Sequence, residues 1–293
     1  MRKAFATGCN LPYLEGAIPL LRRVEALHPE VERYCIVPPE ETSAIRDRLG
    51  GLARVMPAPR AIAGIPDRMQ VAVAKLFITA IDADVVAWVD CDAVLCRPAP
   101  EIWKVEPGTV TAVRDTSYCI LNNVPPDLKE AFVRRHPEAS GQKGMNAGLF
   151  ALRPTDWPGL SEWYERELAE SDYPRYDRIM DQPLLNALWL GKIRWLPHSF
   201  NSHNIYDYAI PSDVRIVHFT GHLKPWALNY PKHEPAYDYW LRYGLGETRG
   251  SRLLGSRLRI MARTPRRVLC RALSRWGLRP NRADRHEIRP GQA

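Results

Sequence analysis

The chain has 293 residues, of which 45% are hydrophobic, and its formal net charge is +8. This is enough apolar material for one large or two small folded domains, so a wholly disordered chain is excluded. No stretch approaches the roughly 18 consecutive apolar residues of a membrane-spanning helix, and polar residues interrupt the N-terminal segment before an apolar region of signal-peptide length develops. We therefore expect a cytoplasmic protein.

The apolar pattern alternates between short strands and amphipathic helices. In chain order it predicts strands at 4–7, 34–37 and 53–56, separated by helices at 14–28 and 41–49. A helix capped by Asp67 is expected to run to about residue 80, and 85–89 is a continuous apolar run, typical of a strand buried on both faces. Further strands are predicted at 109–113, 148–152, 193–196 and 214–219, and further helices at 156–170, 183–190 and 235–243. This alternation indicates an α/β fold with a mostly parallel central sheet flanked by helices.

The composition changes beyond residue 246. The segment 249–293 carries 13 Arg, no Lys and two acidic residues, a net charge of +11, which leaves −3 for the first 248 residues. Leu269, Leu273 and Trp276 fall on one helical face with Arg residues around them. We therefore predict an α/β domain at 1–246 and a basic, amphipathic, partly helical tail at 247–293.

The tail's mixture of Arg and large apolar residues suits the inner face of an anionic membrane better than a groove of nucleic acid, so nucleic acid is not the expected partner. A solvated terminus is the alternative for this segment. A second alternative is a non-enzymatic protein that acts only through this tail, by binding a membrane or nucleic acid.

Two carboxylates follow the predicted buried strand at 85–89. Asp90 and Asp92 are two residues apart, and ligands of open α/β sheets bind at the carboxyl ends of strands. Both can reach one hard cation, which offsets the charge of a leaving diphosphate. The same Asp-x-Asp spacing is also common in ordinary polar loops.

Three later motifs place polar groups beside small or apolar ones. Asn146 and Ala147 enter the strand predicted at 148–152, where the amide can meet sugar hydroxyls and the small residues admit a ligand. Asp181 and Gln182 open the helix predicted at 183–190, where Asp181 is alternatively a simple N-cap. In the segment 216–226, a late strand delivers a His as a candidate third metal ligand, a Gly whose neighbouring amides can reach phosphate and a Lys as a point charge.

The four motifs together resemble the pattern of the family 8 retaining glycosyltransferases, over roughly residues 3 to 243: Asp90-x-Asp92, Asn146-Ala147-Gly148, Asp181-Gln182 and His218-x-x-Gly221-x-x-Lys224-Pro225-Trp226. The resemblance implies a GT-A fold and transfer of a hexose from a UDP-sugar donor to a saccharide acceptor, such as a lipid-linked or cell-envelope saccharide. It also implies Mn²⁺ or Mg²⁺ as cofactor.

The resemblance further implies a role for each matching position. The metal ligands are Asp90, Asp92 and His218. The nucleotide, diphosphate and sugar are met by Ala6, Thr7, Asn10, Lys75, Asp115, Asn146, Ala147, Gly221 and Lys224. Gln182 and Asp181 occupy the catalytic position beside the sugar. The chain departs from relatives that place an acid in the loop after the first strand, because it has Gly8-Cys9 there.

Retention of configuration requires either a covalent intermediate or attack on the face that the diphosphate leaves. An amide such as that of Gln182 is a poor nucleophile, so we favour same-face attack, with the departing diphosphate oxygen taking the acceptor proton. Asp-x-Asp-x-Val after a strand also resembles the nucleophile loop of haloacid-dehalogenase-type Mg²⁺ phosphohydrolases, in which Asp90 attacks phosphorus. That family needs a later acidic pair, which this chain does not offer.

Overall fold

The structure is a computed structural model that describes residues 1–63, 65–116, 119–170, 181–203, 210–221, 223–231 and 235–245. The chain divides into two units, Met1–Glu247 and Thr248–Ala293, and every feature below belongs to the first. The amphipathic tail predicted at 247–293 lies outside the described residues. Within the described ranges, no helix combines the length and the apolar character needed to cross a membrane.

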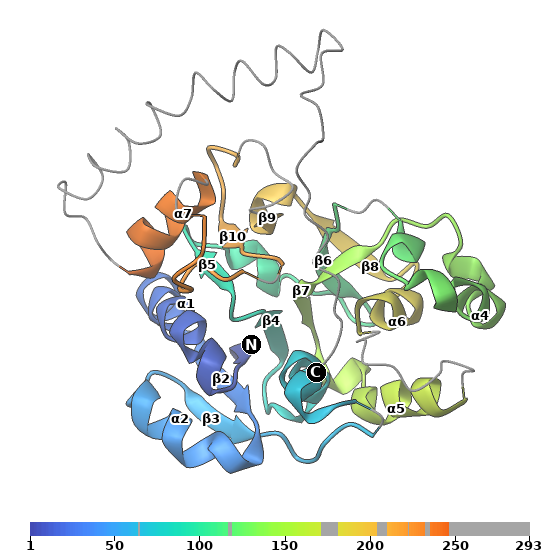
Figure 1. Ribbon diagram of the computed structural model, residues 1–293, viewed down its shortest axis with the longest axis horizontal. Helices are drawn as coiled ribbons and strands as arrows, with labels where there is room; N and C mark the ends of the chain where they lie inside the picture. Colours follow the sequence, from blue (N-terminus) through green and yellow to red (C-terminus); the bar gives the residue numbers. More distant parts are fainter. Residues whose placement is uncertain are drawn as a thin grey trace, which may run out of the picture. The chain divides into compact units, whose positions relative to one another are not determined.

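Seven strands form the central sheet, in the order β3-β2-β1-β4-β7-β6-β8 (Figure 1). Neighbouring strands are parallel except at β7, which runs antiparallel to both β4 and β6. The mostly parallel sheet predicted from the sequence is therefore confirmed. The strands are β1 (Lys3–Gly8), β2 (Glu32–Val37), β3 (Arg54–Pro57), β4 (Val85–Val89), β6 (Val110–Arg114), β7 (Met145–Leu152) and β8 (Ile193–Leu196).

Three short strands form a second sheet, and the first of them, β5, follows β4 directly in the sequence. The second sheet contains β5 (Ala93–Leu95), β10 (Ile216–His218) and β9 (Ser202–His203), in that order. β10 is antiparallel to β5, with His218 opposite Ala93, and parallel to β9. The sequence predicted neither β5 nor β9, because strands of three and two residues are too short to show alternation.

Helices cover both faces of the central sheet, and two of them differ from the prediction in type or by more than two residues at their start. The helix expected from Asp67 to residue 80 is split into a 3₁₀ turn (Asp67–Met69), α3 (Gln70–Val73) and a 3₁₀ helix (Ala74–Ala80), and Asp67 lies in the first turn without capping it. Five consecutive residues from Ala74 to Ile78 are buried, so this segment has no solvent face of the kind that an amphipathic helix shows. α5 begins at Leu160 and not at 156, because Gly159 takes a positive φ of 70° directly before it.

The remaining helices agree with the prediction in place and type, apart from α4, which was not predicted. They are α1 (Leu14–Leu27), α2 (Thr42–Leu49), α4 (Lys129–Arg135), α5 (Leu160–Glu170), α6 (Asp181–Leu188) and α7 (Pro235–Tyr239), which continues as one π-helical turn (Trp240–Gly244).

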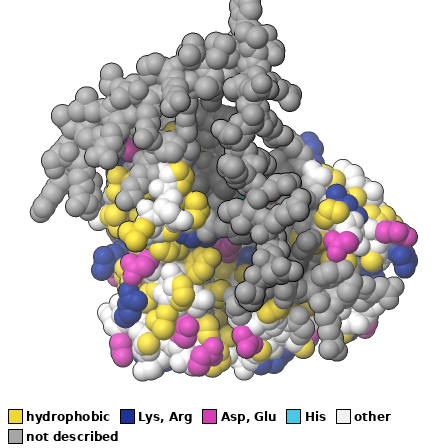
Figure 2. Space-filling model, in the orientation of Figure 1, with side chains coloured by type: hydrophobic (Ala, Val, Ile, Leu, Met, Phe, Trp, Pro, Cys, Tyr) yellow, Lys and Arg dark blue, Asp and Glu magenta, His cyan; other side chains and the backbone are white. Residues whose placement is uncertain are grey.

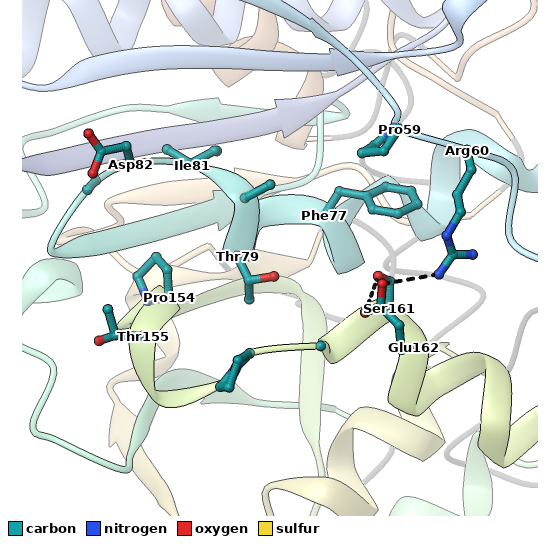
Figure 3. A pocket seen from close by; sticks show the side chains of 14 residues that line it. Pro59, Arg60, Phe77, Thr79, Ile81, Asp82, Pro154, Thr155, Ser161 and Glu162 are labelled. Atoms are coloured by element: carbon teal, nitrogen blue, oxygen red, sulfur yellow. Dashed lines mark hydrogen bonds and ion pairs between the residues drawn. The ribbon is translucent and has the colours of Figure 1, made fainter.

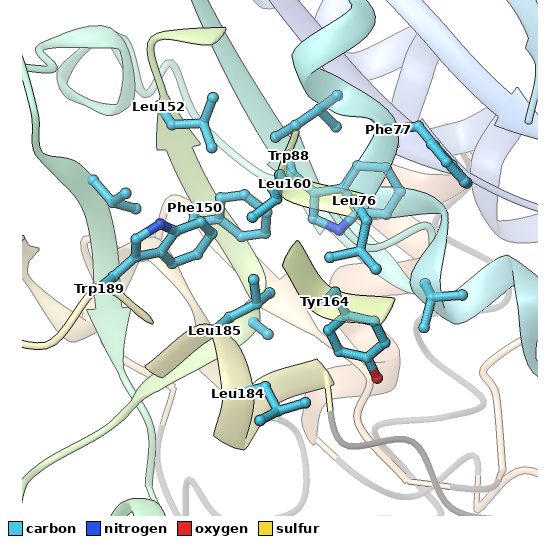
Figure 4. Close-up of a cluster of buried hydrophobic side chains, with 14 of the residues drawn as sticks. Leu76, Phe77, Trp88, Phe150, Leu152, Leu160, Tyr164, Leu184, Leu185 and Trp189 are labelled. Atoms are coloured by element: carbon cyan, nitrogen blue, oxygen red, sulfur yellow. The ribbon is translucent and has the colours of Figure 1, made fainter. Parts of the chain in front are cut away.

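The core lies on both faces of β4. Val86 and Trp88 point to one face and Val85, Ala87 and Val89 to the other, so the continuous apolar run predicted for a doubly buried strand is explained. On the first face, Trp88 from β4 and Phe150 from β7 lie beside α5 and α6 side chains (Figure 4). On the second face the sheet is covered by the apolar sides of α1 and α2.

The described surface mixes charges of both signs. Figure 2 shows acidic and basic side chains close together around the described part of this face, with hydrophobic side chains between them. Among the described residues, the large hydrophobic side chains that are exposed are Met1, Leu223, Leu228 and Leu245. The basic excess of the whole chain therefore does not arise from a basic patch on this face.

Candidate functional site

Two carboxylates and an imidazole converge where β4 ends. The chain leaves β4 through Asp90, Cys91 and Asp92 and enters β5 at once, while β10 pairs with β5 and presents His218 beside Asp92. Nε2 of His218 lies 3.1 Å from Oδ1 of Asp92 and 4.0 Å from Oδ2 of Asp90. One ligand atom from each of the three side chains lies within 4.8 Å of the others.

These separations fit one cation. A divalent ion with bonds of about 2.2 Å requires neighbouring octahedral ligand atoms about 3 Å apart and opposite ones about 4.4 Å apart. The donor set of two carboxylate oxygens and one imidazole nitrogen suits Mn²⁺ or Mg²⁺ better than a soft metal. The three residues predicted as metal ligands are thus brought together.

Gly148 makes room for the imidazole. A Cβ atom at this position would lie 2.2 Å from Cε1 and 2.9 Å from Nδ1 of His218. The sequence prediction began this strand at 148 and gave the small residues there the role of admitting a ligand. In the structure β7 already begins at Met145, and Gly148 accommodates the ring of His218.

Lys224 lies on the other oxygen of Asp92. Its ammonium donates to Oδ2 of Asp92 and, at 3.0 Å, to the carbonyl of Phe219. Burial alone would raise the pKa of Asp92, but His218 and Lys224 outweigh it and hold that pKa well below its ordinary value. Gly221 adopts a φ of 95° in the turn between β10 and Lys224, a conformation that favours glycine.

A buried lysine links two acids of the site. Nζ of Lys75 donates to Oδ2 of Asp181 at 2.9 Å and to the carbonyl of Ala147 at 3.2 Å, and it lies 3.4 Å from Oδ1 of Asp90. Burial lowers the pKa of Lys75, but Asp181 and Asp90 more than compensate, so its pKa is raised and the ammonium stays charged. Asp181 is the first residue of α6, and its carboxylate is bound by Lys75.

A cluster of amides surrounds Asp115 at the end of β6. Oδ1 of Asp115 accepts from Asn146 at 3.2 Å, and Oδ2 accepts from Gln182 at 3.1 Å and from Asn123 at 2.9 Å. Oε1 of Gln182 in turn accepts from the backbone N–H of Ala147 at 3.0 Å. Asp115, Asn146 and Gln182, which the resemblance places in the donor site and beside the sugar, therefore contact one another.

Three predicted donor-site residues lie in β1 or in the loop after it: Ala6 and Thr7 in the strand and Asn10 in the loop. The side chains of Ala6 and Thr7 are fully buried, and the hydroxyl of Thr7 has no hydrogen-bond partner among the described groups. Oδ1 of Asn10 accepts from the backbone N–H of Tyr13 at 3.2 Å and caps a short 3₁₀ turn. A cavity of about 180 Å³ opens beside the carboxyl ends of β2 and β3 and is lined in part by Ala74, which packs against Gly8.

A cavity of about 560 Å³ lies at a different place in the molecule (Figure 3). It is lined by Asp82 and Ala83, which precede β4, whereas Asp90 follows that strand; five residues of strand span roughly 16 Å. Its charged side chains already have partners, because Arg60 contacts Glu162 and Glu165, and Asp82 contacts Arg2. We therefore assign the functional site to the carboxyl end of β4.

Two polar residues of the site were not found from the sequence. Asn201 is 1% exposed, and its Oδ1 lies 3.1 Å from Nδ1 of His218. His203 packs edge-on against His218, with ring centroids 5.5 Å apart, and its Nδ1 lies 3.2 Å from the hydroxyl of Thr116. Burial, and then the neighbouring His218, lowers the pKa of His203 to about 3. Neither residue lies in a motif, so the sequence offered no local signal for them.

The sequence model of glycosyl transferase family 8 matches residues 69–229, more than half of the chain, and this span includes both carboxylates, His218 and Lys224. The chain belongs to this family. No curated protein matches it.

Solved structures show the same fold for this glycosyltransferase. The galactosyltransferase LgtC, in complex with donor and acceptor sugar analogs, matches with a TM-score of 0.60 and 19% identity, over 86% of this chain and 99% of LgtC. The glycosyltransferase GlyE of Streptococcus pneumoniae TIGR4 matches with a TM-score of 0.57 and 17% identity, over 83% of this chain and 61% of GlyE. The bifunctional glycosyltransferase WbbM gives 0.56 and 14%, over 77% of this chain and 47% of WbbM. The GT-A type α/β fold is thereby shown, and the phosphohydrolase alternative is set aside.

Proposed function

We propose that this glycosyltransferase is a retaining enzyme that transfers a hexose from a UDP-sugar to a saccharide acceptor with Mn²⁺ or Mg²⁺ as cofactor. The observation that carries the proposal is the convergence of Asp90, Asp92 and His218 within 4.8 Å, with Lys224 beside them. Asp90, Asp92 and His218 would hold the cation, which would supply a positive charge that offsets the negative charge of the leaving group.

The chain's own residues supply the rest of the diphosphate site. Lys224 is partly buried, pairs with Asp92 and provides a fixed positive charge near the cation ligands. Its pKa is raised, because Asp92 more than offsets the effect of burial, so the charge is present throughout the physiological range. Gly221 has a positive φ in the turn between β10 and Lys224. Backbone N–H groups in a turn of this kind can bind a phosphate.

The surroundings of the sugar position support same-face attack. The carboxylate of Asp181 is held by the ammonium of Lys75, and the amide oxygen of Gln182 accepts from the N–H of Ala147. Neither oxygen is an activated nucleophile in these contacts. The departing diphosphate oxygen is then the base that takes the acceptor proton.

A donor screen tests the proposal. Thermal unfolding is measured with UDP-galactose, UDP-glucose, UDP-N-acetylglucosamine and GDP-mannose, each with and without Mn²⁺. A donor that binds the native state raises Tm by mass action, so we expect one UDP-sugar to raise Tm in the presence of Mn²⁺. Asp92→Ala should abolish the Mn²⁺-dependent part of the shift. Stabilisation by GDP-mannose alone, or an equal shift in wild type and Asp92→Ala, would contradict the proposal.

The acceptor and the location of the enzyme are proposed from the tail. Its net charge of +11 and its apolar residues favour an anionic membrane, so we propose a cytoplasmic enzyme that binds the inner face of the membrane and acts on a lipid-linked or cell-envelope saccharide. Flotation of the full chain with anionic and neutral liposomes measures this. Replacing Arg266, Arg267, Arg271 and Arg275 with Ser should reduce binding to anionic liposomes, and equal binding to neutral ones would exclude it.

A further inference from the structure

The hydrogen bonds around Asn146 fix the orientation of its amide group. Its Oδ1 accepts from the backbone N–H of Gly148 at 3.0 Å, and a backbone N–H only donates. Its Nδ2 lies 3.2 Å from a carboxylate oxygen of Asp115. Two independent contacts thus identify the oxygen and the nitrogen of this amide. The oxygen faces a group that only donates, and the nitrogen faces a carboxylate, which only accepts.

The orientation of Asn146 determines that of Asn201. Because Oδ1 of Asn146 is an acceptor, the group of Asn201 that lies 3.0 Å from it is the donor Nδ2. The carbonyl oxygen Oδ1 of Asn201 is then the atom that faces Nδ1 of His218, at 3.1 Å. A carbonyl oxygen only accepts, so Nδ1 of His218 carries a proton.

We propose that Asn201, itself oriented by Asn146, is a positioning residue that holds a proton on Nδ1 of His218 and so reserves Nε2 for the cation. The competing acceptor is Asp92, whose Oδ1 lies 3.1 Å from Nε2 and, being charged, attracts a proton more strongly than an amide oxygen does. Without Asn201, a neutral His218 would place its one proton on Nε2, toward Asp92, and the ligand lone pair would point away from Asp90 and Asp92. With the proton on Nδ1, the lone pair of Nε2 would point toward Asp92 and Asp90, where the cation would be held.

Burial makes the chain of hydrogen bonds from Asn146 through Asn201 to His218 rigid. Asn201 is 1% exposed, Asn146 8% and His218 4%, so water does not compete freely for these bonds. Both acceptor lone pairs and both donor hydrogens of Asn146 are used, because its Nδ2 also lies 3.4 Å from Oε1 of Gln182. This inference rests on the proposed cation site, and it connects that site to the amide cluster around Asp115.

The first experiment measures the tautomer in the metal-free, full-length protein. Two-bond ¹H–¹⁵N correlation spectra of protein labelled with ¹⁵N-histidine distinguish a protonated from an unprotonated ring nitrogen, and the signal lost in His218→Gln identifies His218. At neutral and mildly alkaline pH we expect Nδ1 of His218 to be protonated in wild type, and in Asn201→Ala the proton should move to Nε2. An unprotonated Nδ1 in wild type overturns the proposal. Because no metal or donor is present, this result does not depend on whether the proposed transferase activity is correct.

The second experiment measures Mn²⁺ affinity by electron paramagnetic resonance of the free ion. Asn201→Ala and Asn201→Leu should bind Mn²⁺ about 10- to 100-fold more weakly than wild type, the usual effect of losing a partner of a metal ligand. Asn201→Asp keeps an acceptor for Nδ1 but loses the donor to Oδ1 of Asn146, so it should bind Mn²⁺ more tightly than Asn201→Ala and more weakly than wild type, which a role in packing alone would not explain. Ser202→Ala removes the neighbouring hydroxyl bond to the carbonyl of His198 and is the matched control, expected to leave the affinity unchanged. Affinity in Asn201→Ala equal to wild type, or equal losses in the Ala and Asp variants, refutes the proposal.

Discussion

Replacing Gly148 with Ala tests whether the backbone of β7 makes room for His218. The added Cβ would lie 2.2 Å from Cε1 of the imidazole, about 1.2 Å short of ordinary van der Waals contact, and 2.8 Å from Oδ1 of Asn146. Both neighbours are buried and hydrogen-bonded, so neither yields freely. Overpacking of this kind costs about 1–3 kcal/mol.

The displacement also disturbs the cation site. A shift of the ring by about 1 Å would stretch the 3.1 Å contacts of its two nitrogens, to Asn201 and to Asp92, beyond hydrogen-bond length. We therefore expect Gly148→Ala to lower the free energy of unfolding by about 2 kcal/mol and to weaken Mn²⁺ binding about tenfold or more. Urea denaturation measures the first effect and isothermal titration calorimetry the second.

A double-mutant cycle identifies the source of the strain. If the clash is with the imidazole, Gly148→Ala should cost about 1 kcal/mol less in a His218→Ala background than in wild type. Only partial relief is expected, because the contact with Asn146 remains. An equal cost in both backgrounds would refute the reasoning that the glycine serves His218.

Three other predictions concern groups around the fold. Lys75→Met leaves the carboxylates of Asp90 and Asp181 without their buried partner, so the free energy of unfolding should fall by about 3–5 kcal/mol. Urea denaturation measures this, and a loss below about 1 kcal/mol would show that the ion pairs of Lys75 are not buried in solution. Burial lowers the pKa of His28, whose Nε2 accepts from a backbone N–H, so its contribution to stability is present above the unfolded pKa of about 6.5 and is lost as the pH falls below it. The decline in unfolding free energy from about pH 7.5 to 5 should be shallower in His28→Gln, and an unchanged slope would contradict this. Burial raises the pKa of Cys96 to about 12, so iodoacetamide should modify it more slowly than the partly exposed Cys119, as peptide mapping would show, and equal rates would disprove the burial.

The sequence predicted the central sheet well, because its strands are long enough to show a pattern. The run at 85–89 predicted a doubly buried strand, and β4 occupies those residues with side chains in two cores. The second sheet escaped prediction because its strands are held by pairing with one another and not by any local periodicity. The helix expected from Asp67 was wrong in type over residues 74–80, a 3₁₀ helix whose first five residues are all buried and so show no single apolar face.

The site was predictable where it follows a motif and not where it follows tertiary contact. Asp90, Asp92 and His218 stood in recognisable spacings, and the structure brings them together. Asn201 directly precedes β9 and reaches His218 because β9 pairs with β10. No pattern in the sequence predicts this pairing. The role of Gly148 was also hidden, since the need for a missing Cβ arises from a ring that lies 70 residues later in the chain.

The one antiparallel strand of the central sheet explains why the cation ligands and the amide cluster lie together. Parallel strands present their carboxyl ends at one edge, and an antiparallel strand between two of them brings its amino end to that same edge. β7 begins there, so the N–H of Asp90 bonds to the carbonyl of Gly148 and the N–H of Asp115 to that of Gly144. The first residues of β7 therefore contact the cation ligand His218 through Gly148 and the amide cluster around Asp115 through Asn146. A change at the start of β7 should consequently affect metal affinity and donor binding together. A change at Asp115 alone should leave the Mn²⁺ affinity of the donor-free protein near that of wild type, because the N–H of Gly148 still fixes the amide of Asn146.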